Sequence, residues 1–150
     1  MKADKAGPSL WARRLGFFGL IPFVILAAAL WVERPGDWAL ARMALLGYGA
    51  TITSFLGAIH WGLVMRDGPA QSARSLLWGV VPSLLAWMAL LLGHAAGLLL
   101  IAGLLWACFA VDRILYPRYQ LQAWLPMRLQ LTLVASLSCL AGAAALLQAA

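Results

Sequence analysis

The stretch that decides the fold runs from Ser75 to Val111 and reads SLLWGVVPSLLAWMALLLGHAAGLLLIAGLLWACFAV, without a single Lys, Arg, Asp or Glu. As one continuous helix, its 37 residues would be roughly 55 Å long, nearly twice the hydrocarbon thickness of about 30 Å. The stretch therefore folds back as two membrane-spanning helices. The predicted hairpin is Gly93-His94-Ala95-Ala96-Gly97, because glycine adopts the left-handed conformation that ends a helix.

The composition of the whole chain is that of a membrane protein. It is 64% hydrophobic and 11% charged, with a mean hydropathy of +0.88, whereas a soluble domain is about 25% charged. This composition excludes intrinsic disorder, and two cysteines exclude a disulfide scaffold. We predict an all-α membrane protein, a bundle of five transmembrane helices, which follows a basic tail over residues 1–14 that is disordered or interfacial. The predicted spans are 15–32, 39–65, 75–93, 97–115 and 128–147.

Basic residues are divided unequally between the two sides of this bundle. Nine of the 11 Lys and Arg fall in the N-terminal tail or in the loops after the second and fourth spans, and only Arg34 and Arg42 fall on the other side. The positive-inside rule then places the N-terminus in the cytoplasm and the C-terminus in the periplasm. We expect a multi-pass protein of the bacterial inner (cytoplasmic) membrane with the lipid bilayer as its partner, and no nucleic-acid binding, because topology explains the net charge. The span over 15–32 is longer than a signal peptide's apolar region, so we expect it to be retained.

Small residues form two neighbouring stripes on the second span. At 3.6 residues per turn, one stripe runs from Gly49 to His60 and the other from Ala50 to Gly62. Rows of this kind let helix backbones approach closely. The residues that we predict to pack against other helices are Gly49, Thr53, Ser54, Gly57 and Gly62. His60 is expected to point into the bundle, either as a packed side chain or as a functional one.

Four polar residues are predicted to lie together at the cytoplasmic end of the bundle. His60 is near the cytoplasmic end of its span, Asp112 is at the end of the fourth span with Tyr116 just beyond it, and Arg128 begins the fifth. In one hypothesis a carboxylate beside His60 lets the imidazole pass a proton or sense pH. In the other, Asp112 forms an ion pair with Arg113 or Arg128 that anchors helices. The fifth span also carries an inward polar stripe, which either bonds helices together or lines a narrow cavity; its members are Arg128, Thr132, Ser136 and Cys139.

Trp61, Trp78 and Trp87 are candidate ligand-proximal residues among the eight tryptophans of the chain. They either wall a pocket for a flat hydrophobic ligand, such as a quinone or porphyrin, or fill the bundle and face lipid. Two further sequences, Gly19-Leu-Ile-Pro22 and Gly79-Val-Val-Pro82, lie 60 residues apart and suggest two duplicated hairpins. Each proline removes a donor from its helix and permits a kink.

No recognisable catalytic motif is present. The chain has no HExxH, GxSxG, P-loop or GxGxxG sequence, and no CxxC pair. His94 in the predicted external hairpin is most of a bilayer away from His60, which argues against a bis-histidine haem. We therefore predict no catalytic residue, no metal ligand and no cofactor, and an enzyme is the less favoured class. Binding of a quinone, porphyrin or lipid is kept as a hypothesis.

Several short sequences carry a resemblance that covers nearly the whole chain. They are Gly19-Leu-Ile-Pro-Phe23, the span Tyr48–Gly62 with its core Ser-Phe-Leu-Gly-x-Ile-His-Trp-Gly, Pro82-Ser83 with Trp87, and Trp124 with Arg128 and Thr132. With these sequences the chain resembles a family of small bacterial and mitochondrial membrane proteins of unknown function, the transmembrane protein 69-like proteins. The resemblance implies a multi-span helical topology and, from its mitochondrial members, an energy-coupling membrane. It implies no particular reaction.

Three function hypotheses follow. The first is an accessory subunit or assembly factor of a larger respiratory or energy-coupling complex, which binds other membrane-protein subunits or itself. The alternative is a small binder or carrier of a hydrophobic ligand, which uses the tryptophans and the surroundings of His60. An intramembrane enzyme that uses His60 and Asp112 ranks last.

Overall fold

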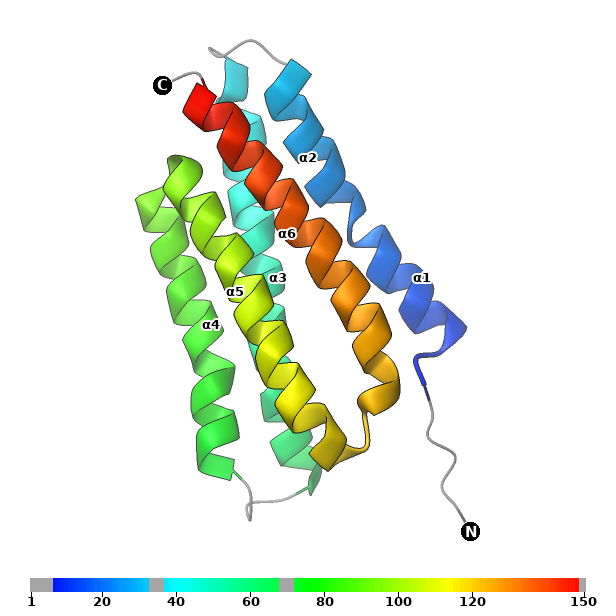
Figure 1. The fold of residues 1–150 in the computed structure, drawn as a ribbon. Helices are drawn as coiled ribbons and strands as arrows, with labels where there is room; N and C mark the ends of the chain where they lie inside the picture. The colour runs from blue at the N-terminus through cyan, green and yellow to red at the C-terminus, as the bar shows by residue number, and fades with distance from the viewer. Residues whose placement is uncertain (1–6, 33–36, 68–71, 149–150) are drawn as a thin grey trace.

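The structure is a computed structural model that describes residues 7–32, 37–67 and 72–148. Its helices form an elongated bundle (Figure 1). They are α1 (Leu10–Phe18), α2 (Ile21–Val32), α3 (Trp38–Asp67), α4 (Ser72–Leu92), α5 (His94–Leu115), the 3-10 helices η3 (Tyr116–Tyr119) and η4 (Gln122–Trp124), and α6 (Leu125–Gln148). No strand occurs within these described ranges.

The predicted fold class, an all-α bundle of five transmembrane helices, is confirmed. Within the part of the chain that the structure describes, five helical stretches are long and apolar enough to cross a membrane, and α1 and α2 together make the first of them. The first turn of α1 and the last turn of α6 lie at opposite ends of the bundle (Figure 1), as an odd number of crossings requires. The side of the membrane that each end faces stays a prediction from the charge bias.

The first span begins earlier than its apolar residues suggested. Helix α1 starts at Leu10, and the Ser9 side chain caps it by accepting a hydrogen bond from the Ala12 N–H at 3.1 Å. Residues 10–14 of the predicted tail are therefore helical and belong to a stretch, Leu10–Val32, that is apolar enough to span a membrane. Residues 1–6 of the predicted tail lie outside the described residues. At the other end of the chain, α6 starts at Leu125 with Pro126 in its opening turn.

The hairpin between α4 and α5 is shorter than predicted. Only Gly93 separates the two helices, and its φ of 59° is in the left-handed region that glycine favours. Ala95 and Gly97, assigned to the hairpin from the sequence, are instead buried residues of α5. A Cβ on Gly97 would collide with the carbonyl oxygen of Ala89. This second glycine therefore allows α4 and α5 to lie close together and takes no part in the turn.

The two prolines predicted to permit kinks behave differently. Helix α1 ends at Phe18 and α2 begins at Ile21, because Pro22 has no N–H and its ring would clash with the carbonyl of Phe18 in a continuous helix. The Tyr48 hydroxyl of α3 donates a hydrogen bond of 2.8 Å to the Gly19 carbonyl at this break. Pro82, in contrast, lies inside α4, which continues through it.

Glycine brings α3 and α4 into backbone contact. A Cβ on Gly57 would lie 2.6 Å from the carbonyl oxygen of Gly79, and a Cβ on Gly79 would collide with the Trp61 indole. On the adjoining face of α3, Gly49 packs against Ile101 of α5, and Thr53 is fully buried. These close contacts place α3 in the interior of the bundle.

The second small-residue stripe of α3 departs from the prediction. Ser54 is half-buried and its hydroxyl donates to the Ala50 carbonyl at 2.9 Å. Gly62, predicted to pack between helices, is instead exposed, with open space where a Cβ would stand. Gly62 follows Gly57 by five residues and so points about 140° away from it, because successive residues of a helix turn by about 100°. The helix that meets Gly57 therefore cannot also meet Gly62.

Candidate functional site

A buried polar cluster joins three helices near the end of the bundle where α5 stops and α6 starts. It consists of His60 from α3, Asp112 from α5 and Arg128 from α6, which are 1%, 2% and 6% exposed. Arg128 Nε and Nη2 donate to Asp112 Oδ2 at 2.8 and 2.7 Å, and His60 Nε2 lies 3.2 Å from Asp112 Oδ1. Both carboxylate oxygens therefore have a partner. The ion pair forms with Arg128, whereas Arg113, the other cation considered from the sequence, is exposed.

The ion pair within the cluster is balanced in charge. A buried carboxylate and guanidinium tolerate loss of water when they are paired and hydrogen-bonded to each other. A carboxylate oxygen accepts hydrogen bonds, so His60 Nε2 carries the hydrogen of its contact with Asp112. His60 Nδ1 is buried and has no hydrogen-bond partner among the described residues. The charges of Asp112 and Arg128 cancel each other, so this pair adds no net charge to the site.

The loop after α5 brings the cluster together. Gln120 adopts a left-handed conformation with φ of 58°, and the Leu121 N–H donates to the Tyr116 carbonyl at 2.9 Å. This compact turn returns the chain so that α6 packs antiparallel to α5, which closes the 16-residue separation of Asp112 and Arg128. Tyr116 itself is buried, and its hydroxyl faces Asp112 and Arg128. The structure thus brings together all four polar residues that the sequence placed at one end.

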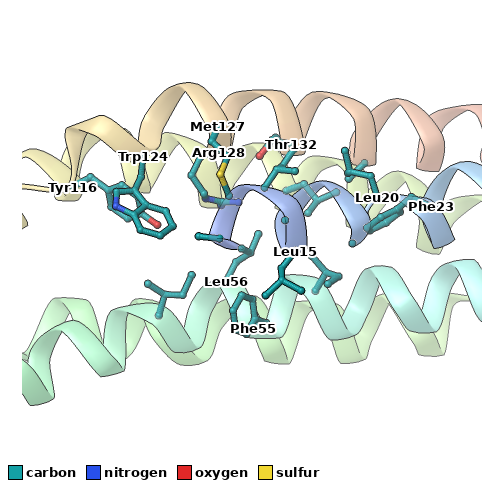
Figure 2. Close-up of a pocket in the computed structure, with 18 residues that line it drawn as sticks. Leu15, Leu20, Phe23, Phe55, Leu56, Tyr116, Trp124, Met127, Arg128 and Thr132 are labelled. Carbon is teal, nitrogen blue, oxygen red and sulfur yellow. The ribbon is translucent and has the colours of Figure 1, made fainter. Parts of the chain in front are cut away.

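A cavity of about 370 Å³ lies beside this cluster, between the first span, α3 and α6. Helix α1 contributes mainly small residues and α3 contributes an apolar row at helical spacing. The lining residues from these two helices are Ala12, Leu15, Gly16, Ile52, Phe55, Leu56 and Ile59. Figure 2 shows Tyr116 and Trp124 at one end of the cavity and Leu20 and Phe23 at the other, with Arg128 and Thr132 between them. The cavity is therefore mainly apolar. Tyr116 and Arg128 define its polar end, and Thr132 lies nearer its middle.

Thr132 is the unusual residue of the cavity wall. It follows Arg128 by one helical turn, is 1% exposed, and its hydroxyl has no hydrogen-bond partner among the described residues. Ser136, one turn further on, accepts a hydrogen bond from Trp106 Nε1 at 3.1 Å and donates to the Leu133 carbonyl. A buried polar group without a partner is rare and costs about 1–3 kcal/mol. Of the three nitrogen- or oxygen-bearing side chains in the polar stripe, Thr132 is thus the one without a hydrogen-bond partner among the described residues.

The cavity opens sideways. Leu15 of α1 and Phe55 of α3 both line it and yet are 65% and 63% exposed, so its mouth lies between these two helices. Helix α1 has no buried residue at all. In a protein of this fold, exposed apolar side chains of the spans face lipid, so the mouth opens toward the bilayer.

The three candidate tryptophans lie away from this cavity. Trp61 bridges α3 and α4, and its Nε1 donates to the Leu76 carbonyl at 3.0 Å. Trp78 is half-buried, with an Nε1 that has no hydrogen-bond partner in the described part of the chain, and Trp87 is exposed. None of them lines the cavity, whose tryptophan is Trp124. The sequence signal for the cavity was the small residues Ala12, Gly16 and Gly19 at helical spacing, which reasoning from aromatic residues overlooked.

The described residues contain no group of three or more His, Cys, Asp or Glu side chains that could hold a metal ion. Cys108 and Cys139 are buried and free. The site therefore offers hydrogen bonds and apolar surface.

Comparison with known proteins places this arrangement in a larger group. A family described as "Protein of unknown function (DUF3429)" matches residues 9–144. Transmembrane protein 69 of Xenopus tropicalis is 38% identical over 142 residues, which are 90% of this chain and 53% of that protein. The chain thus spans about half the length of this relative. No solved structure matches.

Proposed function

The chain belongs to the family of unknown function described as DUF3429, and on that premise we propose that it binds a bilayer-soluble hydrophobic molecule in the cavity between α1, α3 and α6. Membership also confirms the resemblance to transmembrane protein 69-like proteins. Neither description names a reaction or a ligand. The proposal therefore depends on the site.

One observation carries the proposal: a mainly apolar cavity has few polar groups, and one of them, Thr132, is buried and unpaired one helical turn from Arg128. Binding sites for small molecules are mostly apolar, with a few polar groups that fix the ligand's orientation. The volume of about 370 Å³ lies near the lower end of the range for such sites. The mouth between Leu15 and Phe55 supports entry from the lipid phase. The ligand class that we propose, bilayer-soluble hydrophobic molecules, includes quinones, porphyrins and lipids.

Mass spectrometry of everything that is retained after purification in a mild detergent tests the proposal. Ala12→Phe places a large side chain in the cavity wall contributed by α1, and Ala28→Phe, on the exposed side of α2, is its matched control. We expect a hydrophobic molecule to be retained by the wild type and by Ala28→Phe, and to be depleted in Ala12→Phe. Identical extracts from all three proteins, containing only bulk lipid, would contradict the proposal.

A second candidate function is the accessory subunit or assembly factor of a larger membrane complex. It is supported by the outward face of α3, where small residues recur at helical spacing: Gly47 is half-buried, and Thr51, Ala58 and Gly62 are exposed. A Cβ on Gly47 or Gly62 would meet nothing within 4 Å, so this face has room for a neighbouring helix. Gly62→Leu should then abolish co-purification of a partner subunit. Recovery of a lone monomer, with unaffected respiratory complexes in a deletion strain, would count against it.

We retain the bacterial inner membrane as the proposed location. The relative from Xenopus tropicalis is a eukaryotic transmembrane protein, so the compartment depends on the host of this chain. Membrane fractionation with an antibody to the protein decides it.

A further inference from the structure

We propose that the cavity selects ligands whose buried end is uncharged and carries a hydrogen-bonding oxygen, such as a carbonyl or ester oxygen, which pairs with the Thr132 hydroxyl. This inference rests on the proposed function, since it names the class of ligand for the same cavity. Three observations support it: the charge balance of the Asp112–Arg128 pair, the unpaired hydroxyl, and the depth of that hydroxyl in the bundle.

The cation at the polar end of the cavity already has its anion. Arg128 donates through Nε and Nη2 to one oxygen of Asp112, and His60 occupies the other oxygen. An anionic ligand would therefore meet a group whose charge is compensated, next to a carboxylate that repels it. Burial of a charge without a compensating partner is costly. An uncharged end avoids this cost.

The group that lacks a partner in the cavity wall is itself uncharged. The Thr132 hydroxyl is able both to donate and to accept a hydrogen bond, and no described residue pairs with it. The polar residues one turn before and one turn after it, Arg128 and Ser136, are both paired within the protein. A ligand oxygen at Thr132 would remove the penalty of the unpaired hydroxyl, so the two gain a hydrogen bond that each otherwise lacks.

The depth of Thr132 adds to the preference. Thr132 lies seven residues after Leu125, where α6 begins, and this distance corresponds to about 10 Å along the helix axis. A span that begins at the membrane interface therefore places this hydroxyl within the hydrocarbon region, where charged groups are rare and costly. This preference distinguishes the two ligands considered from the sequence. A quinone presents uncharged carbonyl oxygens, whereas a porphyrin with carboxylate substituents would have to keep those carboxylates outside the cavity.

Two photoreactive probes with the same diazirine-bearing alkyl chain test this selectivity on the full chain in lipid nanodiscs. One probe ends in a methyl ester, which accepts hydrogen bonds, and the other ends in a sulfonate, whose charge does not titrate. Saturation of labelling on peptides of α1 and α6 gives an apparent Kd for each probe. We expect the ester to bind at least about tenfold more tightly than the sulfonate, as an unpaired buried charge requires.

Variants of one hydroxyl refine the test. Thr132→Val should weaken binding of the ester about three- to tenfold, which is the range for one hydrogen bond, and Thr132→Ser should preserve it. Ser138→Ala is the matched control, because the Ser138 hydroxyl donates to the Val134 carbonyl and does not line the cavity. Gel filtration of each variant checks that it is folded.

The outcomes separate this inference from the proposed function. Saturable labelling of the cavity in which the sulfonate binds as tightly as the ester would overturn the inference and leave the binding function intact. Equal ester affinity in the wild type and in folded Thr132→Val would also overturn it. If neither probe labels α1 or α6 saturably, the proposed function itself fails. The comparison of the two probes needs only the wild-type protein, so a poorly folded variant does not prevent a decision.

Discussion

The motifs Gly19-Leu-Ile-Pro22 and Gly79-Val-Val-Pro82 have the same glycine and proline spacing but produce opposite structures. The first interrupts the helix and borders the cavity, whereas the second lies in continuous α4, in backbone contact with α3. Gly79 meets Gly57, which has no side chain to hold the helices apart, whereas Gly19 meets the hydroxyl of Tyr48. The same glycine and proline spacing is therefore compatible with both structures, and the two sites differ in the residue that lies opposite the glycine.

The largest expected change in stability is at the ion pair, on the side of the bundle where the first span borders the cavity. Asp112→Asn leaves the Arg128 charge buried without a counter-charge, and this should lower the free energy of unfolding by about 3–5 kcal/mol. Unfolding in mixed micelles with increasing SDS measures the change. Replacement of both Asp112 and Arg128 by Leu should recover part of the loss. A single substitution that costs less than about 1 kcal/mol would show that the pair is solvated.

A smaller change in stability is expected on the other side of the bundle, where Gly57 of α3 meets Gly79 of α4. Gly57→Val puts a branched side chain against the Gly79 backbone, which cannot move aside without separation of the helices. Overpacking of this kind costs about 1–3 kcal/mol. Gly62→Val, on the exposed side of the same helix, should change stability by less than about 0.5 kcal/mol. If Gly57→Val and Gly62→Val lowered the free energy of unfolding equally in the SDS assay, the backbones of α3 and α4 would not be in close contact at Gly57.

Next in size is the hydrogen bond at the helix break. Tyr48→Phe removes the donor to the Gly19 carbonyl, and we expect a loss of about 0.6–1.5 kcal/mol, the range for one hydrogen bond in a membrane protein. Amide hydrogen exchange by mass spectrometry should show faster exchange confined to peptides that cover residues 15–24. Unchanged exchange there would indicate that another donor serves this carbonyl.

The smallest effect is expected at the unpaired hydroxyl. Without ligand, Thr132→Val removes a buried polar group that has no partner, so stability should change by less than about 0.5 kcal/mol or increase. The same SDS titration, with delipidated protein, measures it. Destabilisation by more than about 1 kcal/mol would show that the Thr132 hydroxyl has a hydrogen-bond partner in the protein. The cavity side would then differ less from the side where α3 meets α4.

The span count and the polar cluster were accessible from the sequence for the same reason. The uncharged run from Ser75 to Val111 requires a hairpin, and alternation of spans then puts the ends of α3 and α5 beside the start of α6. His60, Asp112 and Arg128 were placed together by this topology alone. The five-helix fold is confirmed, and the roles of these residues remain predictions.

The cavity and the role of Gly62 required the structure. Both stripes of α3 are small and look equivalent in the sequence. The stripe that contains Gly57 is in contact with other helices of this chain, whereas the other stripe passes from buried Ala50 to exposed Gly62. Helical spacing gives the angle between two faces and does not say which helix meets each. The cavity likewise requires that α1 be set at an angle to α2, and this angle is made at the break before Pro22. No single residue type in the sequence indicates it.

Helix α1 buries none of its nine residues, while α2 beyond the break contributes Phe23, Ala27 and Leu30 to the core. We therefore expect the first half of this span to open locally before the second half does. Local openings of weakly packed segments require far less free energy than global unfolding. A bound molecule would then exchange by displacing α1, the least anchored wall of the cavity, and the ion pair between α5 and α6 would be left undisturbed.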